Sequence, residues 1–191
     1  DVYFVFSGSQ QHMMEEMFLS ANRPFFQSSS MMTLSCIDKE KYLDFANNFF
    51  KGQSRAMDED TFEYIYDVSD KVTWYVQAIL HGIYEHSKDV IDRQLVDDVV
   101  REIIESQSTA YQNYCAWLTE NQQRLLTAIA RERLVASPLG QKFIRSYNLP
   151  AVSSVKAALK SLVDKQLISK TPQGYYVSDR FFAKWLSGRV F

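Results

Sequence analysis

The chain has 191 residues, 46% of them hydrophobic, which is enough for a folded core in one large domain or two small ones, and we expect two. Two cysteines, Cys36 and Cys115, are too few for a disulfide framework or a cysteine-rich metal site, so we expect reduced, buried thiols in a cytoplasmic protein. No apolar run approaches the ~20 residues of a membrane span, and we expect neither a signal peptide nor a membrane partner.

The formal net charge of −2 conceals a division between the two ends of the chain. Residues 1–120 hold 9 Lys and Arg against 20 Asp and Glu, whereas residues 121–191 hold 12 against 3. A basic region of this kind indicates either contact with nucleic acid or docking on the acidic neighbour. The sequence leaves both interpretations open.

The first 51 residues predict part of an α/β domain. Val2–Phe6 is an almost unbroken apolar run of β-forming residues, which is typical of a strand buried on both faces of a parallel sheet. Such a strand needs neighbouring strands, and the mainly helical sequence that follows does not supply them. We therefore expect further residues of the same domain before Asp1.

Two polar residues, Ser7 and Ser9, follow this apolar run. The carboxyl end of a central strand is where an open α/β sheet binds its ligand, so a site for a nucleotide phosphate is one interpretation. The other is a tight turn in which Ser9 caps the next helix, and the spacing does not decide between them. That helix has an apolar face formed by Met13, Met14, Met17 and Phe18.

Beyond a second predicted strand at residues 31–37, the pattern is helical. Asp38 is expected to cap a helix whose apolar face comprises Tyr42, Phe45, Ala46 and Phe49. Residues 52–120 then predict an acidic bundle of four or five helices, two of which begin at Asp58 and Asp92. The clearest apolar stripe of this bundle comprises Leu95, Val96, Val99, Val100, Ile103 and Ile104.

Residues 121–191 predict a winged-helix domain, which consists of three helices, a β-hairpin and a last helix. The expected elements are helices at 121–132 and 139–147, a helix opened by Pro150, strands at 167–170 and 175–177, and a helix capped by Asp179. Ser153 and Ser154 lie near the start of the third helix, where they are expected to help cap its first turn.

Three stretches resemble one family when they are taken together: VYFVFSGSQQHMMEEMF, RPFFQSSSMMTLSCI and YDVSDKVTWYVQAIL, with NQQRLLTAIARE further along. Their order and spacing resemble the carboxyl-terminal part of the archaeal-type P-loop ATPases, a branch of the AAA+ and STAND NTPases. The resemblance implies a mostly α fold with three parts: the end of an α/β nucleotide-binding core at residues 1–51, a helical lid bundle at 52–120 and a winged helix at 121–191.

By this resemblance, Ser9 and Ser7 inherit the role of a sensor near the γ-phosphate of the nucleotide. The family commonly has Gly-Gly-x-Pro before the lid helix that faces the nucleotide, where this chain has Asp70-Lys71-Val72-Thr73. Lys71 is then either a phosphate-facing cation or an ordinary exposed lysine. The family also commonly has an arginine after the sensor helix, where this chain has Gln27-Ser28-Ser29.

The sequence contains neither a G-x-x-x-x-G-K-[ST] phosphate loop nor an apolar strand ending in paired acids that would hold Mg²⁺. We therefore expect ATP and magnesium as cofactors of a parent protein, bound by a P-loop core that is missing from this chain. This chain alone is expected to bind neither cofactor and to be inactive. The principal hypothesis is that the nucleotide state of the core sets the position of the lid and the winged helix.

Two alternatives assign the function to the winged helix itself. One is a DNA-binding transcriptional regulator, in which the contacts to the major groove and to phosphates come from Ser153, Ser154, Lys156, Lys160, Lys170 and Gln173. The other is a protein–protein docking module, in which the basic domain lies against the acidic bundle.

Overall fold

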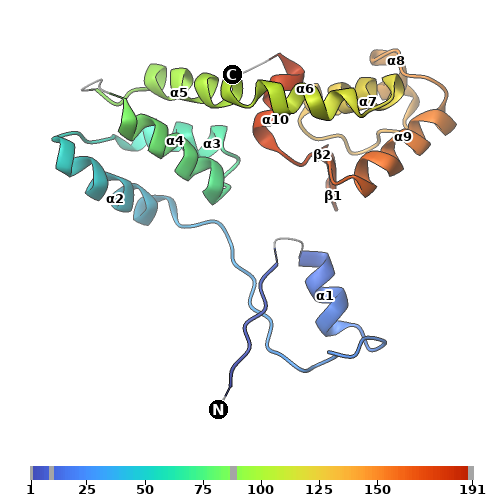
Figure 1. Ribbon diagram of the computed structural model, residues 1–191, viewed down its shortest axis with the longest axis horizontal. Coiled ribbons are helices and arrows are strands. Elements are labelled where there is room, and N and C mark those ends of the chain that lie inside the picture. The colour runs from blue at the N-terminus through green and yellow to red at the C-terminus, as the bar shows by residue number, and fades with distance from the viewer. Residues whose placement is uncertain (1, 9–10, 87–89, 189–191) are drawn as a thin grey trace. The chain divides into compact units, whose positions relative to one another are not determined.

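The computed structural model describes residues 2–8, 11–86 and 90–188, and the fold is mostly α-helical (Figure 1). The chain divides between Cys36 and Ile37 into two compact units. The domain boundaries expected from the sequence, at residues 51 and 120, remain predictions.

The described residues of the first unit form one helix, α1 (Gln11–Leu19), and otherwise irregular backbone. Neither residues 2–6 nor residues 31–37 form a strand in the part of the chain that the structure describes, so both strand predictions are wrong here. Val5 is 93% exposed. The physical reason is that a strand requires the backbone of a neighbour as hydrogen-bond partner, and the described residues provide none for these segments.

The side chain of Phe18, on α1, is the buried centre of the first unit. The rings of Phe6 and Phe25 lie 5.4 and 5.9 Å from it, measured between ring centroids. Met13 and Met17 on the same helix are exposed, as is Cys36, which was expected to be buried. One buried phenyl ring is a small core for a unit with so many apolar residues.

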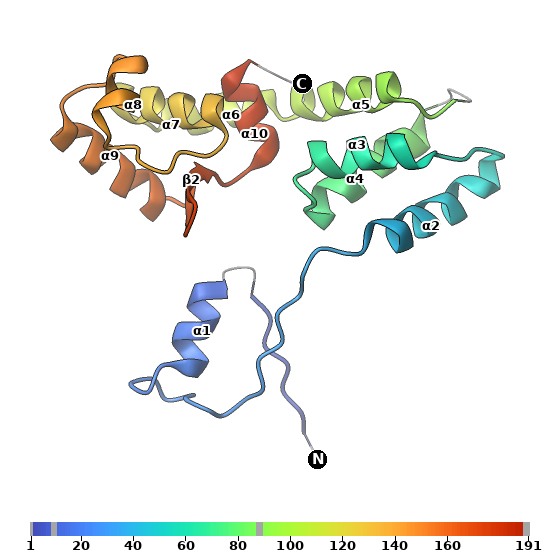
Figure 2. The same cartoon turned by 180° about the vertical axis from the view of Figure 1, so that it is seen from behind.

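Among its described residues, the second unit begins with five α-helices and a short 3-10 helix, η1 (Lys51–Gln53), after the first of them. The α-helices follow one another in Figures 1 and 2. They are α2 (Lys39–Phe50), α3 (Glu59–Val68), α4 (Thr73–Glu85), α5 (Arg93–Ser106) and α6 (Ser108–Ala116). The predicted cap at Asp38 and the predicted helix starts at Asp58 and Asp92 are confirmed. The carboxylates of all three accept a hydrogen bond from the backbone N–H three residues later.

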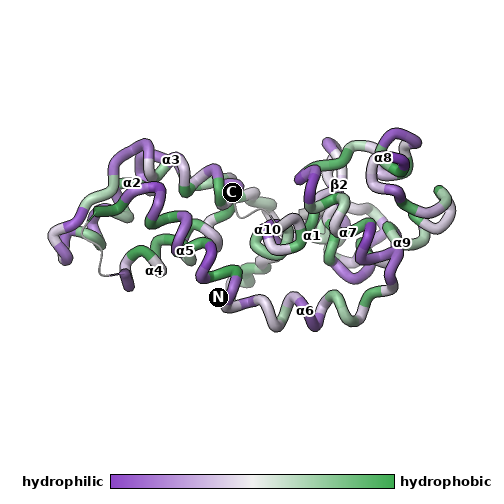
Figure 3. The backbone as a smooth tube through the Cα atoms, turned by 90° about the horizontal axis from the view of Figure 1, so that it is seen from above, coloured by the Kyte–Doolittle hydropathy of each residue, from purple (hydrophilic) through white to green (hydrophobic). Residues whose placement is uncertain are grey.

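Helices α4 and α5 approach each other closely at Gly82. A Cβ atom added there would lie 2.4 Å from the Cγ1 atom of Val99, so only glycine allows this spacing. Figure 3 shows hydrophobic residues alternating with hydrophilic ones along α5, and its predicted apolar stripe is buried or half-buried. The prediction for α2 is partly wrong, because Phe45 and Phe49 are exposed and Phe50 is buried instead.

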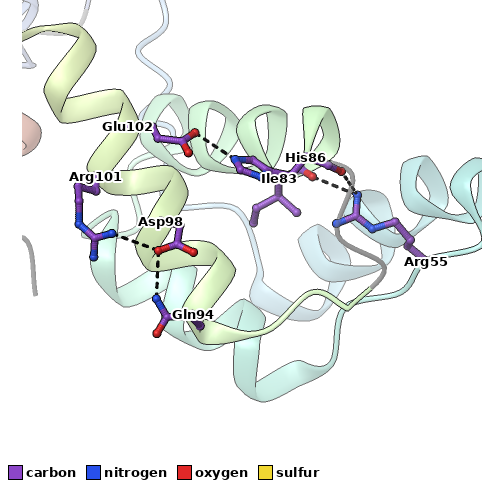
Figure 4. A network of polar contacts seen from close by, with 7 residues as sticks. All are labelled: Arg55, Ile83, His86, Gln94, Asp98, Arg101 and Glu102. Carbon is purple, nitrogen blue, oxygen red and sulfur yellow. Dashed lines mark hydrogen bonds and ion pairs between the residues drawn. The ribbon is translucent and has the colours of Figure 1, made fainter.

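Arg55 fixes the end of α4, as Figure 4 shows. Its guanidinium lies buried between helices and donates hydrogen bonds of 3.1 Å to the carbonyl oxygens of Ile83 and His86. These carbonyls lie at the C-terminus of a helix, where the backbone lacks internal partners and the dipole favours a cation. Arg55 therefore acts as a C-terminal cap from a distant part of the sequence.

The remaining elements form the winged helix that the sequence predicts. They are α7 (Glu120–Glu132), α8 (Gln141–Ser146), α9 (Val152–Asp164), β1 (Ile168–Thr171), β2 (Gly174–Val177) and α10 (Arg180–Ser187). The two strands pair in antiparallel fashion, and Ile168 is opposite Val177. Val135 adds a bridge to Tyr175 through two backbone hydrogen bonds of 2.9 Å, which the sequence did not predict.

Candidate functional site

The turn between α3 and α4 has an unusual backbone. Asp70 and Lys71 both have positive φ, at 49° and 62°, a region that L-residues other than glycine rarely adopt. The family that this chain resembles in sequence commonly has Gly-Gly at these two positions. The N–H of Lys71 donates a 2.9 Å hydrogen bond to the carbonyl of Tyr66, which ends α3 and fixes the turn. The side chain of Lys71 is exposed.

The carboxylate of Asp70 connects the helical bundle to the winged helix. One of its oxygens lies 2.9 Å from Nε of Arg180 at the start of α10, and the other lies 3.9 Å from a guanidinium nitrogen of Arg133. The guanidinium of Arg180 also stacks over the ring of Tyr176, 4.2 Å from its centroid, which restricts its position. The contact joins the acidic and the basic parts of the chain.

Tyr75 makes a second polar connection at the same place. Its hydroxyl accepts a 3.0 Å hydrogen bond from the backbone N–H of Arg180 and donates one of 3.3 Å to the carboxylate of Asp179. Asp179 also caps α10, because it accepts hydrogen bonds from the N–H groups of Phe181 and Phe182. Burial is the main cause that raises the pKa of Tyr75 to about 12, so its hydroxyl keeps its proton at alkaline pH values where an ordinary tyrosine ionises.

Aromatic rings fill the space next to these polar contacts. The ring of Phe181 lies 4.7 Å from that of Tyr75, and the ring of Phe182 lies 4.9 Å from that of Tyr111, measured between centroids. Both phenylalanines are buried. The bundle and the winged helix therefore form one continuous core, within a single compact unit.

The sequence missed this junction, although it identified several of its residues individually. Asp179 was predicted as a helix cap, and Tyr75 lies in one of the stretches that carry the family resemblance. The two are 104 residues apart, and no local pattern shows that they meet. The only available signal was the opposite charge of the two regions, which favoured docking of one on the other.

The proposed sensor residues are distributed over both units. Ser7 is exposed in the first unit, and Lys71 belongs to the second. Ser9 lies outside the described residues. Their roles near a nucleotide remain predictions.

The residues proposed to contact DNA lie on α9 and the hairpin. Ser153, Lys156 and Lys160 are exposed at a spacing of three and four residues, which places them on one face of the helix. Ser154 is half-buried, while Lys170 and Gln173 are exposed on the hairpin. Ala151 is the N-cap of α9 and no side chain caps this helix, so the capping role predicted for the two serines is wrong.

Among the described residues, no group of three or more His, Cys, Asp or Glu side chains could hold a metal ion. In the same ranges, no helix has both the length and the apolar character needed to cross a membrane.

Comparisons with known proteins agree with this architecture. A family described as a probable winged helix domain matches residues 109–188. The solved structure of the Walker-type ATPase PABY2304 of Pyrococcus abyssi matches 94% of this chain with a TM-score of 0.60 and 14% sequence identity. The chain spans 51% of that ATPase, and at this identity the likeness concerns the fold. A search of curated proteins finds no match.

Proposed function

We propose that this chain is the C-terminal half of an ATP-binding P-loop ATPase of the AAA+ and STAND branch, in which nucleotide state moves the bundle and the winged helix. The observation that carries this proposal is the likeness of fold, which extends over nearly the whole chain but over only half of a Walker-type ATPase. The exposed apolar run from Val2 to Phe6 supports it, because burying that run requires additional polypeptide.

The junction supports the mechanical part of the proposal. Because the bundle and the winged helix share a core and an ion pair at Asp70, they move as one body when the bundle moves. The missing P-loop core then supplies the phosphate loop, the acid for Mg²⁺ and the hydrolysis, and Ser7 and Ser9 respond to the γ-phosphate. The winged helix presents a surface to a partner.

The test compares ATP binding by two polypeptides in the presence of magnesium. One is this chain, and the other is the protein expressed from the whole open reading frame. Isothermal titration is expected to show saturable, magnesium-dependent ATP binding by the longer protein and no magnesium-dependent binding by this chain. If the longer protein carries no phosphate loop, or binds no ATP, the proposal is wrong.

DNA binding is a second candidate, favoured by the exposed cations on one face of α9. Lys156 and Lys160 are both exposed, and residues 121–191 carry 12 basic against 3 acidic side chains. Fluorescence anisotropy with a random duplex is expected to give salt-dependent binding. Replacing both lysines by alanine is expected to reduce the slope of log K against log salt by about two.

The matched control for the DNA test replaces Lys41 and Lys51, which are exposed on α2 and at its end. It removes the same charge from the bundle and is expected to leave the slope unchanged. Undetectable binding of the unmodified chain at low salt would eliminate this candidate.

A further inference from the structure

A cavity of about 380 Å³ lies at the junction of the bundle and the winged helix. Its walls come from the second half of α3 and the turn after it, from the end of α7, and from α10. The charged side chains that line it are Asp67, Asp70, Arg131, Arg133, Arg180 and Lys184. A volume of this size is within the range of small-molecule sites in proteins.

Positive charge predominates in the wall of this cavity. Four basic side chains face two carboxylates, and one of these carboxylates, Asp70, is shared between Arg180 and Arg133. Arg180 is held in place by its stacking on Tyr176, and its own side chain is only 23% exposed. A preorganised guanidinium next to a second one forms a geometry that suits the oxygens of a phosphate group.

Lys184 gives supporting evidence from electrostatics. Burial lowers its pKa, and the nearby charge of Arg133 lowers it further, whereas Asp70 and Asp97 act in the opposite direction. Asp97 also accepts a 2.7 Å hydrogen bond from the hydroxyl of Tyr64 in the same wall. The positive charges in the wall therefore repel each other, and an anion placed between them would reduce the repulsion.

We propose that this cavity binds the phosphoryl group of a small phosphorylated molecule, held by Arg133, Arg180 and Lys184. The apolar side chains of Val68, Ala130 and Ala183 also line the cavity and leave room for a small organic part. The site goes beyond the proposed function, because all its residues belong to this chain and it needs no phosphate loop.

Asp70 has a specific role in this site. Its carboxylate occupies Arg180 when the cavity is empty, so a phosphoryl group must compete with it. Binding would transfer Arg180 from a contact with the bundle to a contact with the ligand, which links occupancy to the junction.

The test titrates this chain with inorganic phosphate, pyrophosphate and AMP at constant ionic strength, with NMR of backbone amides as the readout. We expect saturable shifts at residues 130–133 and 183–187, and tighter binding of the two larger probes. Arg133→Gln and Lys184→Gln should each weaken binding about 5-fold, which corresponds to the loss of one charge-assisted hydrogen bond in a partly exposed site. Asp70→Asn should strengthen it by a similar factor.

Arg145→Gln is the matched control, because this arginine is exposed on α8 and outside the cavity. It should leave the affinity unchanged. Arg133 is 73% exposed, so its replacement does not threaten folding. The proposal is overturned by an absence of saturable shifts up to about 10 mM ligand, a range that covers weak affinities, by shifts confined to α9, or by equal effects of the cavity and control variants.

The outcome is independent of the ATP test above. Phosphate binding by this chain without magnesium-dependent ATP binding by the longer protein would support the cavity site and refute the proposed function. Magnesium-dependent ATP binding by the longer protein without phosphate binding by this chain would support the proposed function and refute the cavity site.

Discussion

Residues 2–36 and residues 37–188 differ in where their large apolar side chains lie. In the longer segment, apolar side chains from every α-helix contribute to one buried core, α6 through Tyr111. In the shorter segment, Phe18 is the buried one among the described residues, and the run from Val2 to Phe6 is exposed. Since both segments have similar apolar residues, the difference shows that the shorter one lacks surfaces against which to pack.

We expect replacement of a phenylalanine by alanine to have a large effect on stability in the longer segment and a small effect in the shorter one. Phe182→Ala should lower the free energy of unfolding by about 3–5 kcal/mol, because this buried ring packs on Tyr111 and Trp185. Phe4→Ala should change it by less than about 0.5 kcal/mol. Urea unfolding followed by far-UV circular dichroism measures both. Equal losses would show that the two segments share a core.

The polar contacts of Tyr75 test the junction itself. Tyr75→Phe removes an acceptor for Arg180 and a donor for Asp179, and should destabilise the chain by about 1–2 kcal/mol. The folded-state pKa of about 12 is above the ordinary value of 10.0, so the unmodified chain should lose stability as the pH rises from about 10 towards 12. The Tyr75→Phe variant should lose less stability over that pH interval. An identical loss in both proteins would show that Tyr75 does not contribute to the pH dependence of stability.

The turn between α3 and α4, where Asp70 and Lys71 have positive φ, offers a test in which the substitution should increase stability. Lys71→Gly should raise the free energy of unfolding by about 0.5–1 kcal/mol, because glycine adopts positive φ without steric cost. The same change at Lys160, in the interior of α9, should lower it by about 1 kcal/mol. A loss of stability in both variants, measured by urea unfolding, would indicate that the side chain of Lys71 makes a stabilising contact.

The smallest expected effect follows from removing residues 1–36 altogether. The core of the second unit is formed by its own residues, so the unfolding midpoint of the truncated chain should lie within about 2 °C of that of the full chain. A change of about 1 kcal/mol in the free energy of unfolding would shift this midpoint further. Differential scanning calorimetry gives this value. A decrease of more than about 5 °C would mean that the first unit contributes to the core of the second.

The sequence predicted those features that depend on local patterns. The winged helix was predicted from the order of its helices and strands and from a cap at Asp179, patterns that each act within a few residues. The caps of α2, α3 and α5 are of the same kind. All of them lie where the structure has the ends of elements.

Features that depend on distant partners were not predicted. A β-forming run becomes a strand only beside another strand, so the pattern at Val2–Phe6 is not sufficient by itself. Phe45 and Phe50 are both aromatic, and the packing of neighbouring helices decides which one is buried. The contacts of Asp70 and Tyr75 with α10 follow from the folded arrangement, and so does the cavity beside them.

The most direct test of the account is hydrogen exchange at the backbone amides of Tyr3, Phe4 and Val5. We predict rapid exchange in this chain, because these residues are exposed and have no strand partner among the described residues. In the protein expressed from the whole open reading frame, the same amides should exchange at least about 100-fold more slowly, since they would lie in a central strand. Equal exchange in the two proteins, or an open reading frame that adds no residues before Asp1, would contradict it.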